Sequence, residues 1–226
     1  MEKIPLNIGI KRGTHRRDDA NAALADAAFE PVRKAALGRS KYKCVRCGLE
    51  SGVNLVTKKK SALQVHHVDN NHHNNDDPNN LQAYCDLDHA VHHIGCDAPT
   101  AGGNAGWASQ MRVAYIPGLS AEDLNLLQRA IGAALTEPTL KDAANEILTM
   151  LGVLTLPVRD VFGSSKSKDF AVAMAQLSEV EYEDRCVDGL RVLFHPNILK
   201  QAGAQMVIDQ PLLTPRTWST LLDGNR

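Results

Sequence analysis

The feature that most constrains this chain of 226 residues is a pair of cysteines, Cys44 and Cys47, with two residues between them. Two thiolates at this spacing on a tight turn can bind one zinc ion, and Gly48 allows the chain to fold back after them. The spacing also fits a redox pair, but a thioredoxin-like motif needs a strand before it and a helix after it. Here a basic turn precedes the pair, and the sequence LESG at 49–52 follows it. The pattern therefore favours zinc.

The cysteine count and the apolar content indicate a globular protein from a reducing compartment. Five cysteines leave one unpaired, and three have metal-ligand spacing, which favours the cytoplasm. No apolar run approaches the roughly 18 residues of a membrane-spanning helix, so no membrane span is expected. The first residues lack the basic start and apolar stretch of a signal peptide.

The net charge of −1 conceals an uneven distribution. Residues 1–60 contain 14 Lys and Arg against 6 Asp and Glu, whereas the remaining residues contain 11 against 20. A basic N-terminal third suits a polyanion or an acidic protein partner. Neutralisation of one half by the other explains the same pattern, so charge alone selects no function.

Seven of the nine histidines lie between residues 42 and 93. In this window we expect short strands at 63–69 and 80–85 on either side of a polar loop at 70–79, and then a helix at 86–93. A histidine-rich loop can be exposed surface or can bind metals weakly and without specificity. Chance alone, however, poorly explains so many histidines in one short segment.

Strand, loop, strand and helix, with paired histidines, a later Asn-Leu and a final histidine, resemble the HNH (ββα-metal) endonuclease motif. The resemblance covers about 50 residues. It implies that His67 activates water as a general base, and that His66 and His89 hold one divalent cation, Mg²⁺ or Mn²⁺. It also implies that Asn80 fixes the loop.

The chemistry of DNA phosphodiester cleavage explains why such residues are needed. Cleavage requires a general base with a pKa near neutrality and a cation that stabilises the developing charge on the phosphate and the leaving oxygen. A neutral imidazole can supply the base, and imidazole and oxygen ligands with open positions can hold the cation.

Many HNH members also carry a structural zinc held by two Cys-x-x-Cys pairs. The resemblance implies that Cys44, Cys47 and Cys85 match three of those ligands, with Asp88 in the fourth place. Zinc accepts a carboxylate, so these four residues could close a tetrahedral site. Three other side chains could take the fourth place instead: His89, His92 and Cys96.

A second resemblance spans most of the chain. Short segments at 6–13, 42–48, 69–75, 113–120 and 159–163 are similar, in this order, to the IcmJ (DotN) family. The resemblance implies a cytoplasmic component of a type IVB (Dot/Icm-like) secretion or conjugation apparatus. Such proteins belong to the coupling complex and bind the coupling ATPase at the inner membrane, and their HNH-like fold is a zinc-stabilised scaffold. This sequence keeps the paired histidines, which leaves a DNA endonuclease as the alternative.

A third interpretation is a zinc-ribbon DNA-binding module that uses the basic N-terminal arm for phosphates. Aromatic residues make up only 4% of the chain, and no stacking platform for bases is visible in the sequence. We therefore rank this interpretation below the scaffold and the endonuclease.

The predicted fold class is α+β, with an HNH-like zinc core, an N-terminal strand and arm, and a mostly helical C-terminal region. The strand, basic arm and a short helix starting at Pro31 occupy 1–41, the zinc-binding core 42–96, and the helical region 107–226. The Gly- and Ala-rich segment 97–106 has the composition of a linker. In the last region we expect strands at 111–115 and 190–194, helices at 120–135 and 139–151, a further helix around 170–177 and a short one at 215. Cys186 is expected to be buried.

Overall fold

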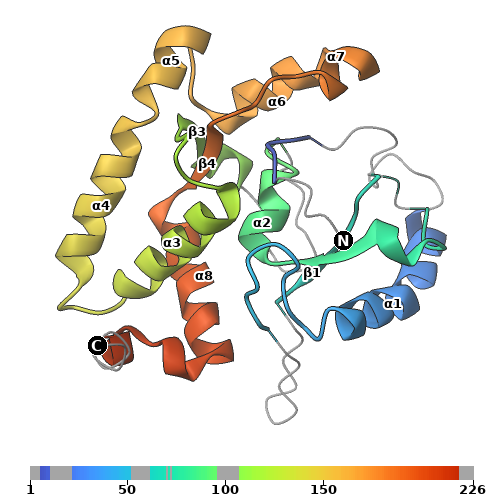
Figure 1. Ribbon diagram of the computed structural model, residues 1–226, viewed down its shortest axis with the longest axis horizontal. Coiled ribbons are helices and arrows are strands. Elements are labelled where there is room, and N and C mark those ends of the chain that lie inside the picture. Colours follow the sequence, from blue (N-terminus) through green and yellow to red (C-terminus); the bar gives the residue numbers. More distant parts are fainter. Residues whose placement is uncertain are drawn as a thin grey trace.

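A computed structural model describes residues 6–10, 22–51, 62–69, 71, 73–95 and 107–218. In these residues helices predominate, and the strands form two antiparallel pairs, so the mixed helix-and-strand class is confirmed. Helix α2 (Asp86–Val91) lies between helix α1 (Ala22–Arg39) on one side and the C-terminal helices on the other (Figure 1).

The first sheet is the hairpin of β1 (Gln64–His67) and β2 (Leu81–Tyr84), in which His67 lies opposite Leu81. A 3-10 turn, Pro78–Asn80, leads into β2, and α2 follows it directly. Strand, loop, strand and helix therefore occur in the predicted order, although α2 is shorter than expected.

Two predictions for the N-terminal region are wrong in detail. Helix α1 begins at Ala22 and contains Pro31 in its interior, because the alanine-rich segment before the proline favours helix on its own. Residues 6–10 belong to neither sheet. The Gly9 amide donates to Val91 O and the Gly9 carbonyl accepts from the Ile94 amide, so this segment pairs with the end of α2.

The second sheet joins β3 (Met111–Tyr115) to β4 (Leu190–Phe194), with Met111 opposite Phe194. Both strands lie where the sequence predicts them, and α3 and α4 confirm the next two expected helices. The helices of this region are α3 (Ala121–Ala134), α4 (Lys141–Val153), α5 (Leu156–Phe162), α6 (Ser167–Ala175), α7 (Glu179–Glu183) and α8 (Pro196–Asp209). Of these, α5, α7 and α8 are not predicted. Within the described residues the expected final helix shows a 3-10 turn, Pro215–Thr217, and its later part lies outside them.

Helices α3 and α8 approach each other closely through glycines. A Cβ atom on Gly132 would lie 1.8 Å from the carbonyl oxygen of Leu199, and one on Gly203 would lie 2.1 Å from the amide nitrogen of Ala133. Only glycine permits such an approach of two backbones. The buried apolar side chains of α8 then join those around α2 and the first sheet in one core cluster.

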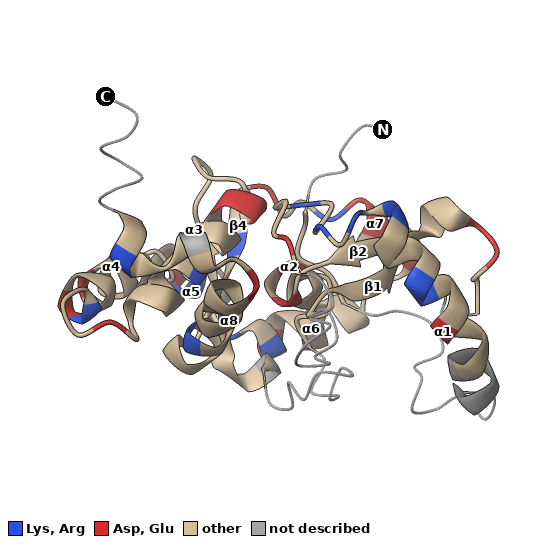
Figure 2. Ribbon diagram, turned by 90° about the horizontal axis from the view of Figure 1, so that it is seen from below, with Lys and Arg blue, Asp and Glu red and all other residues tan. Residues whose placement is uncertain are grey.

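No helix among the described residues is both long enough and apolar enough to cross a membrane. Figure 2 shows Lys and Arg on both the α1 side and the α4–α5 side of the molecule. Several residues that make the N-terminal third basic, including 11–17 and 58–60, lie outside the described residues, as does the expected linker at 97–106. Cys186 is exposed, so its predicted burial is wrong.

Candidate metal centre

The turn that carries Cys44 and Cys47 is built by backbone hydrogen bonds. The Cys44 amide donates to Leu49 O at 2.8 Å, and the Gly48 amide donates to Cys44 O at 2.9 Å. Gly48 has a φ of 74°, a conformation that glycine adopts without the strain that a Cβ atom would bring. The chain therefore folds back after the second cysteine, as the sequence predicts.

Strand β2 and the first turn of α2 supply the other two candidate ligands. Cys85 is the N-cap of α2, and its sulfur accepts a hydrogen bond from the Asp88 amide at 3.4 Å. The cap brings the side chains of residues 85 and 88 to the same end of the helix. The Val45 amide donates to Ala83 O at 2.9 Å, and this contact holds the cysteine turn against β2.

The structure brings together Cys44, Cys47, Cys85 and Asp88. Their sulfur and carboxylate atoms all lie within 4.8 Å of one another, so the four residues could hold a metal ion. Cys44 Sγ lies 3.1 Å from Asp88 Oδ2, and Cys47 Sγ lies 3.7 Å from Cys85 Sγ. Asp88 has no exposed surface, and Cys44 and Cys85 are buried. Of the other candidates for the fourth place, Cys96 lies outside the described residues.

The electrostatics of this cluster favour a cation. Burial, and then the nearby Cys85 sulfur, raise the pKa of the Asp88 carboxyl to about 7. Burial also raises the pKa of the Cys85 thiol to about 12. Burial opposes ionisation of Cys44 too, but hydrogen bonds from Cys47 and Cys85 outweigh it and lower the pKa of Cys44, whereas the hydrogen bond with Cys44 raises the pKa of Cys47. Several acidic groups thus compete for negative charge in a buried space, and a divalent cation would let them ionise together.

A second candidate cluster consists of His66, His89 and His93, whose ring nitrogens also lie within 4.8 Å of one another. The sequence predicts the first two as ligands of a divalent cation, and the structure brings them together. The prediction from the sequence does not include His93, although the spacing of four residues between His89 and His93 places both on one face of a helical turn. Burial, and then the neighbouring imidazoles, hold the pKa of His66 well below its usual value. Its ring is therefore neutral at pH 7, the form that binds metals.

His67 does not belong to this cluster. Successive side chains of a strand point to opposite faces, so His66 and His67 diverge. The His67 Nε2 atom lies 3.0 Å from Asn75 Oδ1, and the ring packs against Phe29 of α1. Because the amide oxygen only accepts, this contact fits a proton on Nε2.

Asn80 fixes the loop between the strands, as expected from its place in the motif. Its side-chain oxygen accepts from the Asp69 amide at 2.9 Å, and its Nδ2 donates to Asn74 O at 3.0 Å. The Asp69 carboxylate in turn accepts from the Asn71 amide and from Asn74 Nδ2. These bonds hold the loop ends in place on either side of His67.

Aromatic packing connects the two candidate clusters. The rings of Tyr84, His66 and His92 stack, with centroids 5.1 Å apart for the first pair and 4.6 Å apart for the second. Arg46, which lies between the two cysteines of the turn, has its guanidinium 5.2 Å from the centroid of Tyr84 and donates to the Tyr84 hydroxyl at 3.0 Å. The cysteine turn therefore contacts the histidine cluster through Arg46 and the ring of Tyr84.

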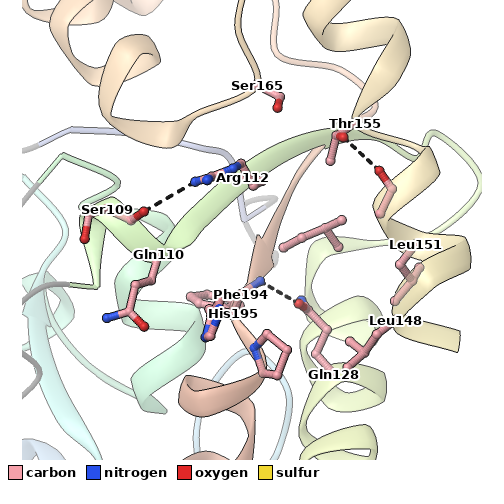
Figure 3. Close-up of a pocket in the computed structure, with 13 residues that line it drawn as sticks. Ser109, Gln110, Arg112, Gln128, Leu148, Leu151, Thr155, Ser165, Phe194 and His195 are labelled. Carbon is pink, nitrogen blue, oxygen red and sulfur yellow. Dashed lines mark hydrogen bonds between the residues drawn. The ribbon is translucent and has the colours of Figure 1, made fainter. Parts of the chain in front are cut away.

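A hollow of about 340 Å³ lies elsewhere, between α4 and the second sheet (Figure 3). Apolar side chains such as Leu148, Leu151 and Phe194 contribute to its lining. The buried Gln128 amide also lines it, but its nitrogen donates to Val192 O and its oxygen accepts from the Phe194 amide. The hollow lies outside the metal centre and shares no ligand with it.

Neither a scan against protein-family models nor a search of curated proteins finds a match to this chain. The class that the fold and the site define is a mixed helix-and-strand protein with two candidate metal clusters. Both clusters use residues of one strand–loop–strand–helix unit, and the first also uses the cysteine turn that precedes it.

Proposed function

We propose that this protein is a zinc-stabilised scaffold, a cytoplasmic component of a type IVB secretion or conjugation coupling complex that binds the coupling ATPase. The observation that carries the proposal is the closed character of the cluster formed by Cys44, Cys47, Cys85 and Asp88. Its ligand atoms are mostly buried, and structural zinc sites are closed in this way, whereas catalytic sites keep a position open.

The geometry of the cluster supports zinc as its metal. Zinc–sulfur bonds of about 2.3 Å in a tetrahedron separate two sulfurs by about 3.8 Å, and Cys47 Sγ and Cys85 Sγ are 3.7 Å apart. Soft thiolate ligands also select zinc over Mg²⁺ or Ca²⁺. The order of elements around the cluster supports an HNH-like ββα core, within which this zinc site would be structural.

A surface on three consecutive helices supports the binding of a protein partner. Met150, Val153, Val161, Phe162 and Val172 of α4, α5 and α6 are all more than half exposed. Exposed large apolar side chains on consecutive helices favour contact with another protein. We call these five residues the α4–α6 apolar surface, and we propose it as the ATPase-facing side.

Co-purification with the coupling ATPase tests the scaffold. The purified chain should retain the C-terminal tail of the ATPase on a column, and Val161→Asp together with Phe162→Asp should abolish retention. Val180→Asp is the matched control, because Val180 is equally apolar and 68% exposed but lies on α7. If the two purified wild-type proteins do not associate, the proposal is wrong.

The histidine cluster favours a second function, a DNA endonuclease of the HNH type that uses Mg²⁺ or Mn²⁺. His66, His89 and His93 would hold a divalent cation, which offsets the charge that develops on a phosphate. His67, whose Nε2 contacts Asn75, would accept the proton of the attacking water. Its position on the opposite face of β1 requires the substrate to reach both faces of the strand end.

Plasmid nicking tests this second function. Supercoiled plasmid incubated with the wild type and Mg²⁺ or Mn²⁺ should relax, His67→Ala should remove cleavage while leaving metal binding intact, and His93→Ala should remove both. His195→Ala is the control, because His195 is exposed at the start of α8. Failure of the wild type to cleave with any divalent ion eliminates the endonuclease and leaves the scaffold untouched.

A further inference from the structure

The two oxygens of the Asp88 carboxylate have different partners. Oδ2 lies 3.1 Å from Cys44 Sγ, within the ligand cluster, whereas Oδ1 accepts a hydrogen bond of 2.7 Å from Asn125 Nδ2. Asn125 belongs to α3 and is 37 positions away in sequence, and both side chains are buried. One oxygen is therefore available to a metal, and the other connects the cluster to the C-terminal region.

The orientation of Asn125 is itself fixed. Its side-chain oxygen accepts from Gln128 Nε2 at 3.4 Å, so its nitrogen points toward Asp88. Gln128 is held in turn by Val192 O and the Phe194 amide of β4. A buried amide network of this kind is costly unless every member has a partner, which leaves Asn125 little freedom to turn away.

Helix α3 is also joined to α8 and to the first turn of α2. Arg129, one turn beyond Asn125, donates to Ala202 O at 3.0 Å and to the Asp86 carboxylate. The close approach at Gly132 prevents α3 from sliding along α8. Asp88 is therefore connected through Asn125 to α3, and α3 is connected to α8.

We propose that Asn125 is a positioning residue for the metal cluster, and that through it metal binding at Cys44, Cys47, Cys85 and Asp88 orders the C-terminal helices against α2. This inference rests on the proposed zinc scaffold and deepens it. Asn125 holds Asp88 in a geometry that offers one oxygen to the metal while the other is occupied by its N–H. A cysteine in the fourth place would offer one sulfur to both partners, whereas the aspartate offers each of them a separate oxygen. The aspartate is thus the residue that makes the connection.

A double-mutant cycle on zinc affinity tests the positioning role. Zinc affinity is measured by chelator competition for the wild type, Asn125→Ala, Asp88→Cys and the double variant. Loss of an outer hydrogen bond typically weakens metal binding about 10–100-fold, and we expect this for Asn125→Ala. In the Asp88→Cys background the same substitution should have little effect, because the oxygen that Asn125 contacts is gone. The proposal would be overturned if Asn125→Ala lowered zinc affinity equally in the wild type and in the Asp88→Cys variant, or if it did not lower zinc affinity in the wild type.

Amide hydrogen exchange tests the second part of the proposal, that metal binding orders the C-terminal helices. Zinc added to the metal-free wild type should increase protection in α3 and α8 as well as in the cysteine turn, and in Asn125→Ala the increase should be confined to the turn. Asn125→Ser is the second variant if the alanine variant does not fold. Unchanged protection of α3 in the wild type overturns the proposed ordering. A wild type that binds no zinc overturns this inference and the zinc site together, whereas zinc binding with an additive cycle overturns this inference alone.

Discussion

The carboxylate of Asp86, in the first turn of α2, accepts a hydrogen bond from the guanidinium of Arg129, in the middle of α3. The Arg129 side chain is 1% exposed and that of Asp86 is 19% exposed, so the ion pair is buried on one side only. Burial opposes the charge on Arg129, but Asp86 outweighs it and raises the pKa of the guanidinium. The pair fastens the helix of the metal cluster to the C-terminal region.

Asp86→Ala should lower the free energy of unfolding by about 3–5 kcal/mol, because it leaves a fully buried cation without its partner. Arg129→Met should cost less, since the remaining carboxylate reaches water and methionine fills much of the space. Urea denaturation measures both. Asp160→Ala, which breaks the exposed pair with Arg159, is the control and should change stability by less than about 0.5 kcal/mol. A larger loss for Arg129→Met than for Asp86→Ala would contradict this account.

Gly132 and Gly152 should respond in opposite directions to alanine. A Cβ atom at Gly132 would meet backbone atoms of α8, so Gly132→Ala should destabilise the protein by several kcal/mol or prevent folding. Nothing lies within 4 Å of the Cβ position at Gly152 in α4, where alanine should add about 0.5–1 kcal/mol of stability. Thermal unfolding of the two variants checks this contrast, and a tolerated Gly132→Ala would show that α3 and α8 do not approach as described.

If the closed cluster holds zinc as proposed, Cys44→Ser should release it and unfold the cysteine turn, because a structural zinc contributes roughly 10 kcal/mol of apparent binding energy. Elemental analysis of extensively dialysed protein measures the metal, and amide exchange measures the turn. Cys186→Ser removes an exposed thiol outside the cluster and should leave both readouts unchanged. Equal zinc content in the two variants would exclude Cys44 as a ligand.

If both clusters bind metal as proposed, His93→Ala should remove the binding of the second divalent ion while leaving the proposed zinc of the first cluster in place. The two sets of ligands share no residue, so their losses should be independent. Calorimetric titration of the zinc-loaded protein with Co²⁺ or Ni²⁺ measures the second site. His73→Ala is the control, since His73 lies on the exposed loop outside both clusters. Retention of the second ion by His93→Ala would mean that these histidines pack against one another without binding that ion.

The candidate ligands of the closed cluster could be predicted from the sequence because metal-binding spacing is local. Cys44 and Cys47 share one turn, and Cys85 and Asp88 share one helix start, so only the pairing of these two short segments had to be inferred. The strands on either side of the polar loop follow from local patterns in the same way. Asn80 is recognisable by its distance from the paired histidines.

The residues that connect the cluster to the rest of the protein could not be predicted in this way. Asn125 and Arg129 are polar residues inside an amphipathic helix, and their burial depends on where α8 and α2 pack. Helix α8 itself follows a strand whose partner, β3, lies far earlier in the chain. The helix that contains Pro31 shows the opposite case, in which a strong local preference overrides a residue that usually marks a helix start.

The loop beside His67 should depend on the charge of Asp69. Burial acts against that charge, but hydrogen bonds from Asn74, from the Asn71 amide and from Asn80 outweigh it and lower the pKa of the Asp69 carboxyl. Its contribution to stability is therefore fully present above the unfolded value of about 3.9 and is lost as the pH falls through the lower folded value. Because the side chain is mostly exposed, the contribution should be below about 1 kcal/mol. Asp69→Asn imitates protonation, so it should open the loop at pH 7 to proteolysis, whereas Asp76→Asn, on the same loop but outside these bonds, should not. Equal cleavage of the two variants would show that Asp69 does not hold the loop.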